Sequence, residues 1–292
     1  MILTNKSNLP ESIVRAIQAD DYDKNADFSV SDLIAPAQQV QLRKKHSDQI
    51  EEDVLEKVWS LYGKAFHHVL QLSAEPDCVA EKRFYKDIVF DPMHKAVKLS
   101  GQIDLYDPKI KTLYDYKSLS VWNAVYGSRT ADYIKQLNCY NYLMGGVAEN
   151  LVVVAIYRDW HERDTLKNND LPRVPIQEIR LPVQDKETIE RWIVERLYAI
   201  HTESECTKAE MWESDTKYAI MKEGRKSAIN GGIHSTQESA QSMIETLAGG
   251  HYIEERPGER RRCARYCNVA KLCPQYRNYL TSQPVPALME DI

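Results

Sequence analysis

Hydrophobic positions recur along the chain with two periods, and each period predicts a different kind of element. A helical spacing runs through residues 47–72, where apolar side chains return every three or four positions. Alternation of apolar and polar residues marks 81–90 and 96–106 as strands, and 111–118 is predicted as a third short strand. The turn signal Asp107-Pro108 joins the second and third strands as a hairpin.

A second series of elements follows this hairpin. A helix is predicted over 129–145, where two glycines end it, and 151–158 is an apolar run of strand length. Another strand is predicted over 174–181 and an amphipathic helix over 185–201. Because helices alternate with strands, the pattern predicts an α/β fold with a mixed central β-sheet flanked by helices. After Cys206 the chain becomes polar and strand signals are few.

These changes of pattern divide the chain into four predicted parts. Residues 1–45 are predicted as an N-terminal helical arm and 46–205 as the core. Residues 206–281 form a cysteine-containing segment that we expect to pack on the core, and 282–292 are predicted as a tail.

Composition narrows the class of protein. The chain has 292 residues, 43% hydrophobic and 28% charged, which is enough to build a sizeable core. Its net charge of −5 excludes a uniformly basic nucleic-acid coat but leaves room for a local basic groove. The longest apolar stretch is strand-sized, and no basic region followed by an apolar run opens the chain. We therefore expect a cytoplasmic protein with no membrane span.

Two aspartates and a lysine carry the most specific chemical signal. Asp115 and Lys117 share one face of a predicted strand while Tyr116 points to the other, and the hairpin brings Asp104 beside them. Two carboxylates suit Mg²⁺ or Mn²⁺, the Tyr116 carbonyl offers a further oxygen, and an ammonium stabilises charge on a phosphate. A D-x-K tripeptide alone more often marks a solvated strand face, so its neighbours decide the interpretation.

Further polar residues stand in a fixed order around this hairpin. The series is Gly63-x3-His67, Glu81, Gly101-x2-Asp104, Asp115-Tyr116-Lys117 and Gln136-x3-Tyr140. In this order it resembles PD-(D/E)xK nucleases of the RecB type. That family includes nuclease domains of recombination helicase–nucleases, the iron–sulfur nucleases of CRISPR adaptation and stand-alone phage enzymes. The first acidic motif reads I-D-L here in place of P-D, a variation that is normal in this branch.

The resemblance implies a restriction-endonuclease-like core and a role for each motif residue. Three residues would ligate the divalent metal: His67, Asp104 and Asp115. Lys117 would be the catalytic lysine. Glu81 is a weaker candidate, as a carboxylate that either supports the ligands of the first metal or binds a second metal. Gln136 and Tyr140 would contact the DNA backbone or hold the lysine. Taken alone, His67 is better explained as a helix histidine packed on the sheet, and only the other motifs favour a ligand.

Three of the six cysteines crowd into eleven residues, at Cys263, Cys267 and Cys273. In a chain without an export signal, such crowding is typical of a metal or cluster site rather than of disulfides. Cys206 is the best candidate for a fourth ligand, and Cys78 is the second. Four thiolates suit an iron–sulfur cluster or zinc. The resemblance favours a structural [4Fe–4S] cluster, with zinc as the alternative.

Basic residues form their densest patch around the first cysteine of this trio. Arg261 and Arg262 in this patch, with Arg129 after the hairpin, are the candidate DNA contacts. Pairing of the arginines with neighbouring glutamates is the competing explanation. Trp59 and Trp212 are expected to be packing residues.

The sequence therefore predicts a Mg²⁺- or Mn²⁺-dependent deoxyribonuclease, most simply an exonuclease on single-stranded DNA or DNA ends. Recombination, repair or phage DNA processing would be its setting, in a host cytoplasm if the enzyme is phage-encoded. DNA is the expected partner, and a recombination or helicase protein is a further candidate. The alternative is a DNA- or protein-binding subunit of a recombination or spacer-capture complex with little catalysis. Cleavage polarity and oligomeric state stay open.

Overall fold

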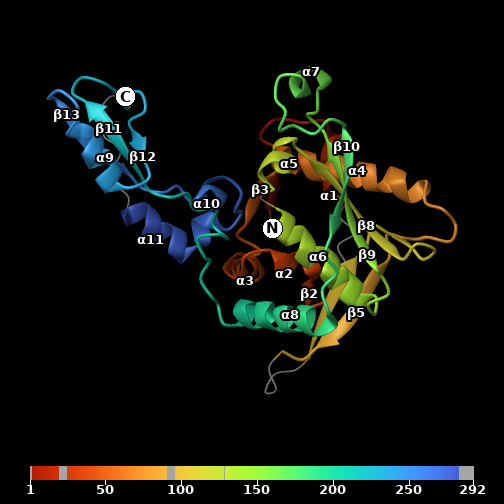
Figure 1. Ribbon diagram of the computed structural model, residues 1–292. Helices are drawn as coiled ribbons and strands as arrows, with labels where there is room; N and C mark the ends of the chain where they lie inside the picture. The colour runs from red at the N-terminus through yellow and green to blue at the C-terminus, as the bar shows by residue number, and fades with distance from the viewer. Residues whose placement is uncertain (1, 20–24, 91–95, 128, 283–292) are drawn as a thin grey trace. The chain divides into compact units, whose positions relative to one another are not determined.

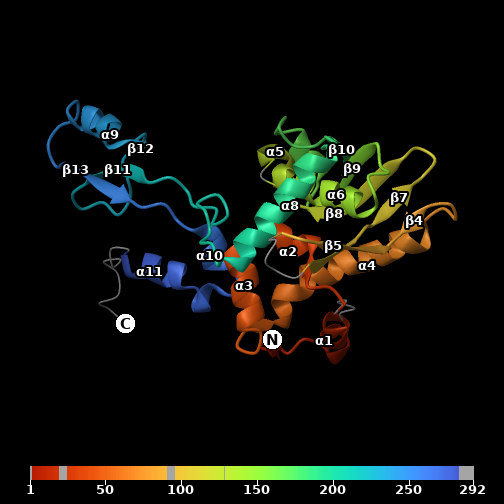
Figure 2. The same ribbon diagram turned by 90° about the horizontal axis from the view of Figure 1, so that it is seen from below.

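The computed structural model describes residues 2–19, 25–90, 96–127 and 129–282, so almost all of the predicted tail lies outside the described residues. The chain divides into two compact units, Met1–Ser204 and Glu205–Ile292 (Figures 1 and 2). No helix in the described part combines the length and apolar character needed to cross a membrane.

A five-stranded sheet forms the centre of the first unit, with strand order β10-β9-β8-β7-β4. β8 and β9 run parallel, whereas the other neighbours in this sheet run antiparallel. The predicted α/β class with a mixed sheet is therefore confirmed. The strands are β4 (Val79–Ala80), β7 (Leu105–Asp107), β8 (Thr112–Leu119), β9 (Asn150–Tyr157) and β10 (Ile176–Leu181).

Two smaller sheets complete the strands of this unit. One has the order β2-β6-β5, and the other pairs β1 with β3 in parallel. Their strands are β1 (Ile2–Thr4), β2 (Phe28–Ser29), β3 (Glu51–Asp53), β5 (Arg83–Ile88) and β6 (Val97–Gln102).

The chain passes from one sheet to the next at two facing points, between β4 and β5 and between β6 and β7. Two backbone hydrogen bonds hold this break together, from the Glu81 amide to the Asp104 carbonyl and from the Ile103 amide to the Lys82 carbonyl, each 3.0 Å long. Glu81 has a φ of 48°, a left-handed conformation that is uncommon outside glycine. Ile103 is fully buried, which leaves the neighbouring Asp104 to face away from the core.

Helices cover this scaffold, and α6 (Thr130–Leu143) lies along β8 and β9 (Figure 1). α6 buries Leu137 and Cys139 completely, and the chain leaves it through Gly145 and Gly146, both with positive φ. The other helical elements of the unit are α1 (Glu11–Gln18), α2 (Val30–Ile34), α3 (Ala37–Lys45), η1 (Val54–Lys57), α4 (Val58–Leu72), α5 (Trp122–Tyr126), α7 (Glu162–Thr165) and α8 (Lys186–His201).

Residues 1–45, predicted as an N-terminal helical arm, contain the helices α1, α2 and α3. They also contribute to the core of the first unit, because β2 pairs with β6, and Val30, Leu33 and Val40 are buried. α2 packs on β6 and α6, and α3 packs on α8. The helix predicted from residue 47 begins at Val58, since residues 51–53 pair with β1 and the next four form a 3₁₀ turn.

The second unit contains a small sheet that the polar sequence did not predict. Its strand order is β12-β11-β13, with Ala219 and Ile220 fully buried, and α9 packs on the sheet. β11 buries three consecutive residues, Ala219, Ile220 and Met221, between charged ends, so it lacks the alternation by which strands were predicted. The elements are β11 (Lys217–Lys222), β12 (Ile233–His234), α9 (Gln237–Ile244), β13 (His251–Arg256), α10 (Arg261–Arg265), η2 (Ala270–Leu272) and α11 (Pro274–Ser282).

Gly101 lets α6 approach β6 closely. A Cβ atom built on Gly101 would lie 2.8 Å from side-chain atoms of both Tyr140 and Leu143. Gly101→Ala is expected to lower the free energy of unfolding by about 1–3 kcal/mol, because the ring of Tyr140 must move off the strand. Urea unfolding measures the change.

Gly63 provides the matched control. It lies inside α4, and nothing stands within 4 Å of its added Cβ. Gly63→Ala should raise the free energy of unfolding by about 0.5–1 kcal/mol, since alanine restricts the unfolded chain and suits a helix better. Equal stabilities of the two variants would contradict the close approach of α6 to β6.

Candidate active site

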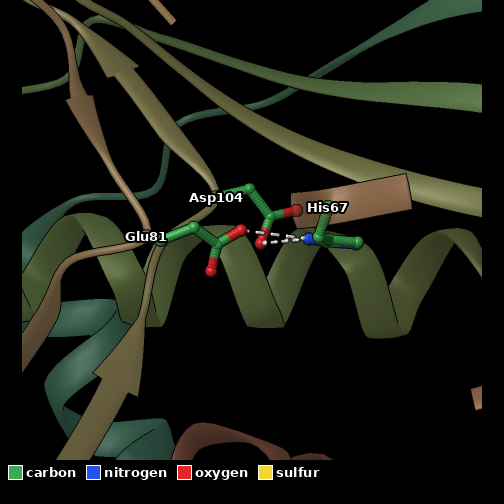
Figure 3. Close-up of side chains that lie close together, drawn as sticks. All are labelled: His67, Glu81 and Asp104. Carbon is green, nitrogen blue, oxygen red and sulfur yellow. Dashed lines mark hydrogen bonds and ion pairs between the residues drawn. The ribbon is translucent and has the colours of Figure 1, made fainter. Parts of the chain in front are cut away.

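Three possible metal ligands meet where the strands change sheets. His67 comes from α4, and Glu81 and Asp104 come from the two sides of the break (Figure 3). Each offers a ligand atom within 4.8 Å of the other two. His67 Nδ1 lies 3.3 Å from Glu81 Oε1 and 3.5 Å from Asp104 Oδ1. One nitrogen and two carboxylate oxygens thus converge on one point.

A further hydrogen bond with a neighbouring residue orients each of these three side chains. His67 Nε2 donates to the Tyr116 carbonyl at 3.1 Å, and the Tyr116 amide donates to Asp104 Oδ2 at 2.7 Å. Gln102 Nε2 donates to Glu81 Oε2 at 2.6 Å. Such outer hydrogen bonds orient metal ligands. The Tyr116 carbonyl, predicted as a metal ligand, therefore holds His67 in this structure. Gln102 was not predicted, although it shares strand alternation with Asp104.

The electrostatics of this group favour bound protons when no metal is present. The hydrogen bond to Glu81 raises the pKa of His67, and both ring nitrogens face acceptors. Burial, and then the charge of Asp115, raise the pKa of the Asp104 carboxyl to about 7. Burial opposes ionisation of Glu81, but hydrogen bonds from His67 and Gln102 outweigh it and lower that pKa. A divalent cation at this point would displace protons as it binds.

Asp115 and Lys117 form an ion pair on the face of β8 that α6 covers. Lys117 Nζ lies 2.7 Å from Asp115 Oδ2, and Asp115 is only 2% exposed. Burial would lower the pKa of Lys117, but the charges of Asp115 and Asp104 outweigh it and raise that pKa. Asp115 lies outside the group of three possible ligands. The amide of the next residue, Tyr116, donates to Asp104, and the charge of Asp115 contributes to the raised pKa of Asp104.

One face of α6 lies over this ion pair. Gln136 Nε2 donates to the Tyr140 hydroxyl at 3.0 Å, so the two residues meet as their spacing predicts. Burial, and then the charge of Asp115, raise the pKa of Tyr140. Tyr133, one turn before Gln136 on α6, was not predicted as a site residue. Its buried hydroxyl has no hydrogen-bond partner within the described residues.

A cleft of about 590 Å³ opens onto two of the three possible ligands, His67 and Glu81. α4 lines one wall with Trp59, Lys64 and His67, and the strands contribute Glu81, Arg83 and Lys117. Trp59 is 62% exposed, so the expectation that it packs in the core is wrong.

The predicted arginine contacts are spread over both units. Arg129, beside α6, has its guanidinium 5.7 Å from the ring centre of Tyr133. In the second unit, Arg261 is exposed on α10, while Arg262 lies over the ring of Trp212 and donates to the Glu210 carbonyl. The neighbouring basic residues pair largely with glutamates, as in Arg256–Glu254, Arg260–Glu213 and Arg265–Glu259.

The predicted cluster cysteines all belong to the second unit. Burial, with smaller contributions from Glu210 and from the thiols of Cys273, Cys263 and Cys267, raises the pKa of Cys206 to about 12. The Gln275 side chain bonds both the amide and the carbonyl of Cys206, at 3.0 and 2.8 Å. Within the described residues, no three of these sulfur atoms all lie within 4.8 Å of one another. Cys78, the second candidate, belongs to the first unit.

Comparison with known proteins identifies the family. A family model described as the PD-(D/E)XK nuclease superfamily matches residues 14–274. A search of curated proteins found no match. The crystal structure of SSO0001 is similar in fold, with a TM-score of 0.50 and 14% sequence identity over 90% of this chain and 94% of that one. The family match spans most of the chain and confirms the resemblance at the superfamily level, and the chain belongs to the PD-(D/E)XK nuclease superfamily.

Proposed function

We propose that this nuclease is a Mg²⁺- or Mn²⁺-dependent exonuclease that hydrolyses phosphodiester bonds in single-stranded DNA or at DNA ends. The observation that carries the proposal is the Asp115–Lys117 ion pair beside the convergent His67, Glu81 and Asp104. The preference for single strands or ends, and a setting in recombination, repair or phage DNA processing, follow from the RecB-type motif order.

The donor set suits a hard divalent cation. His67, Glu81 and Asp104 offer one nitrogen and two carboxylates, and Asp115 adds a third carboxylate close to Asp104. When bound, such a cation polarises the phosphate and lowers the pKa of a water. Tyr116 and Gln102 hold these side chains in orientation through their hydrogen bonds.

Lys117 supplies the positive charge of the proposed reaction. Its raised pKa keeps the ammonium charged at neutral pH, and Asp115 fixes its position. A buried ammonium can orient the attacking water or stabilise the charge that develops on the phosphate. Tyr140 and Gln136 close this face of β8, where they hold the lysine or contact the DNA backbone.

Lys117→Ala is expected to lower the rate of DNA hydrolysis by at least about 100-fold, because one preorganised charge is worth that much in a transition state. Labelled linear single- and double-stranded DNA, with Mn²⁺ or Mg²⁺ and with chelator, gives the rates. Product lengths distinguish exonuclease from endonuclease action.

Lys109→Ala is the matched control, since Lys109 lies in the turn of the same hairpin and is 60% exposed. It should cleave like the wild type. If the wild-type protein binds DNA but never cleaves it with either metal, the catalytic assignment is wrong and the binding-subunit alternative replaces it.

The raised pKa of Asp104 makes the metal-free protein sensitive to pH. The folded state favours the neutral carboxyl, so its contribution to stability is complete below pH 3.8 and is lost as the pH rises through about 7. Without metal, the melting temperature of Asp104→Asn should therefore rise relative to that of the wild type, by several degrees as the pH goes from 5 to 8.

Addition of Mn²⁺ at pH 8 should reverse that order, because the wild type gains a bound ion and the variant lacks a ligand. Asp107→Asn, in the same hairpin, should track the wild type under all conditions. A constant difference between Asp104→Asn and wild type across pH would contradict the assigned environment of Asp104.

We further propose that Cys206, Cys263, Cys267 and Cys273 hold a [4Fe–4S] cluster, with zinc as the alternative. Supporting this, the side chain of Gln275, two residues after Cys273, bonds the backbone of Cys206, and the charges of the other three cysteines add to burial in opposing ionisation of Cys206. Metal binding would relieve that repulsion and would draw the sulfurs closer than they lie here. Such a centre would tie together the two ends of the segment that contains β11, β12, α9 and β13.

Cys206→Ser is expected to lose most of the bound metal and to lower the melting temperature, whereas Cys78→Ser should retain both. Iron, sulfide and zinc analysis after anaerobic purification gives the metal content. Zinc without iron would replace the cluster by a zinc site, and full metal loading of Cys206→Ser would remove Cys206 from the ligand set.

A further inference from the structure

Trp59 lies at the cleft with its ring in solvent. The side chain is 62% exposed although it lines the same hollow as His67 and Lys117. Tryptophan is large and apolar, so leaving it open beside a polar site forgoes the burial that would stabilise the fold. Its position is better explained by a ligand that covers the ring.

Arg158 connects this ring to the strand that carries the catalytic lysine. Its guanidinium carbon lies 4.7 Å from the ring centre of Trp59, a cation–π contact. The same guanidinium donates to the Ser118 carbonyl at 3.2 Å, and Ser118 follows Lys117 in β8. Trp59 on α4 and the end of β8 are thus bridged by one side chain.

The charge of the cleft suits a polyanion. Lys64, Arg83 and Lys117 line it together with Trp59, and Arg158 lies against the tryptophan ring. Glu81 is the acidic residue of the lining, and Asp115 pairs with Lys117, so Lys64, Arg83 and Arg158 give the side of the cleft near Trp59 its positive charge in a chain with a net charge of −5. A flat aromatic ring among cations is the arrangement with which proteins bind unpaired nucleotides, where bases stack and phosphates meet the charges.

We propose that Trp59, braced by Arg158, is a stacking platform for one unpaired base of the DNA strand that enters the cleft. Bases inside a duplex already stack on their neighbours, so only a single strand or a frayed end can place a base on this ring. Trp59 is then a specificity-determining residue. The inference rests on the proposed nuclease function and adds the structural reason for its preference for single strands.

Steady-state cleavage with Mn²⁺ tests this platform. Trp59→Ala should raise KM for single-stranded DNA about 10-fold, equivalent to about 1.4 kcal/mol, with kcat changed much less. Trp59→Phe should retain most of the affinity because it keeps an aromatic face. Leu72→Ala, which removes a 75% exposed side chain from the same helix outside the cleft lining, should match the wild type.

Abasic substrates make the test specific. In a series of single-stranded substrates, each carries one abasic site at a different position. Binding to the wild type should weaken for one of these positions, and binding to Trp59→Ala should not weaken for that position. Such non-additivity means that the ring and that base act as one pair. Additive losses, or a Trp59→Ala enzyme with unchanged KM, would overturn the platform. A wild-type protein that neither binds nor cleaves any DNA would instead overturn the proposed function.

Discussion

Between β4 and β5, and opposite them between β6 and β7, the backbone leaves one sheet and enters another. Two hydrogen bonds bridge this break, and Glu81 takes up a left-handed conformation to make it. Ile103 points into the core, so Asp104 must point out beside Glu81. Regular pleating would have sent these carboxylates along separate strand faces. The interruption gathers them at one point, where His67 of α4 reaches both.

The contact between α6 and β6 is the second constraint on the site. Gly101 has no Cβ, and the space that this leaves allows Tyr140 and Leu143 to lie against the strand. Tyr140 and Gln136 are thereby held over the Asp115–Lys117 pair. The glycine three positions before Asp104 is thus explained by helix packing rather than by turn geometry. The same strand, β6, thus determines how α6 packs and where Tyr140 and Gln136 of that helix lie.

The point where His67, Glu81 and Asp104 converge would bind either protons or a divalent cation. The hydrogen bond to Glu81 raises the pKa of His67 against the effect of burial, whereas burial itself raises the pKa of Asp104, so both groups favour their protonated forms. A hard cation supplies the positive charge that these groups otherwise take from protons. The ammonium of Lys117 stays charged for a different reason, since Asp115 and Asp104 outweigh its burial. Lys117 is therefore the fixed positive charge of the site, and a divalent cation would be a second, exchangeable one.

The sequence by itself determined the α/β class, the hairpin around Asp104, Asp115 and Lys117, and the helical pair Gln136 and Tyr140. Strand alternation and helical spacing are local geometries that residue order specifies. Glu81 was only a weak candidate and Gln102 was missed, because a left-handed residue and a change of sheet have no periodic signal. The burial of Val30, Leu33 and Val40, the exposure of Trp59 and the small sheet around β11 also required the tertiary structure. Which side of an element is covered depends on its neighbours in space, and no local pattern contains them.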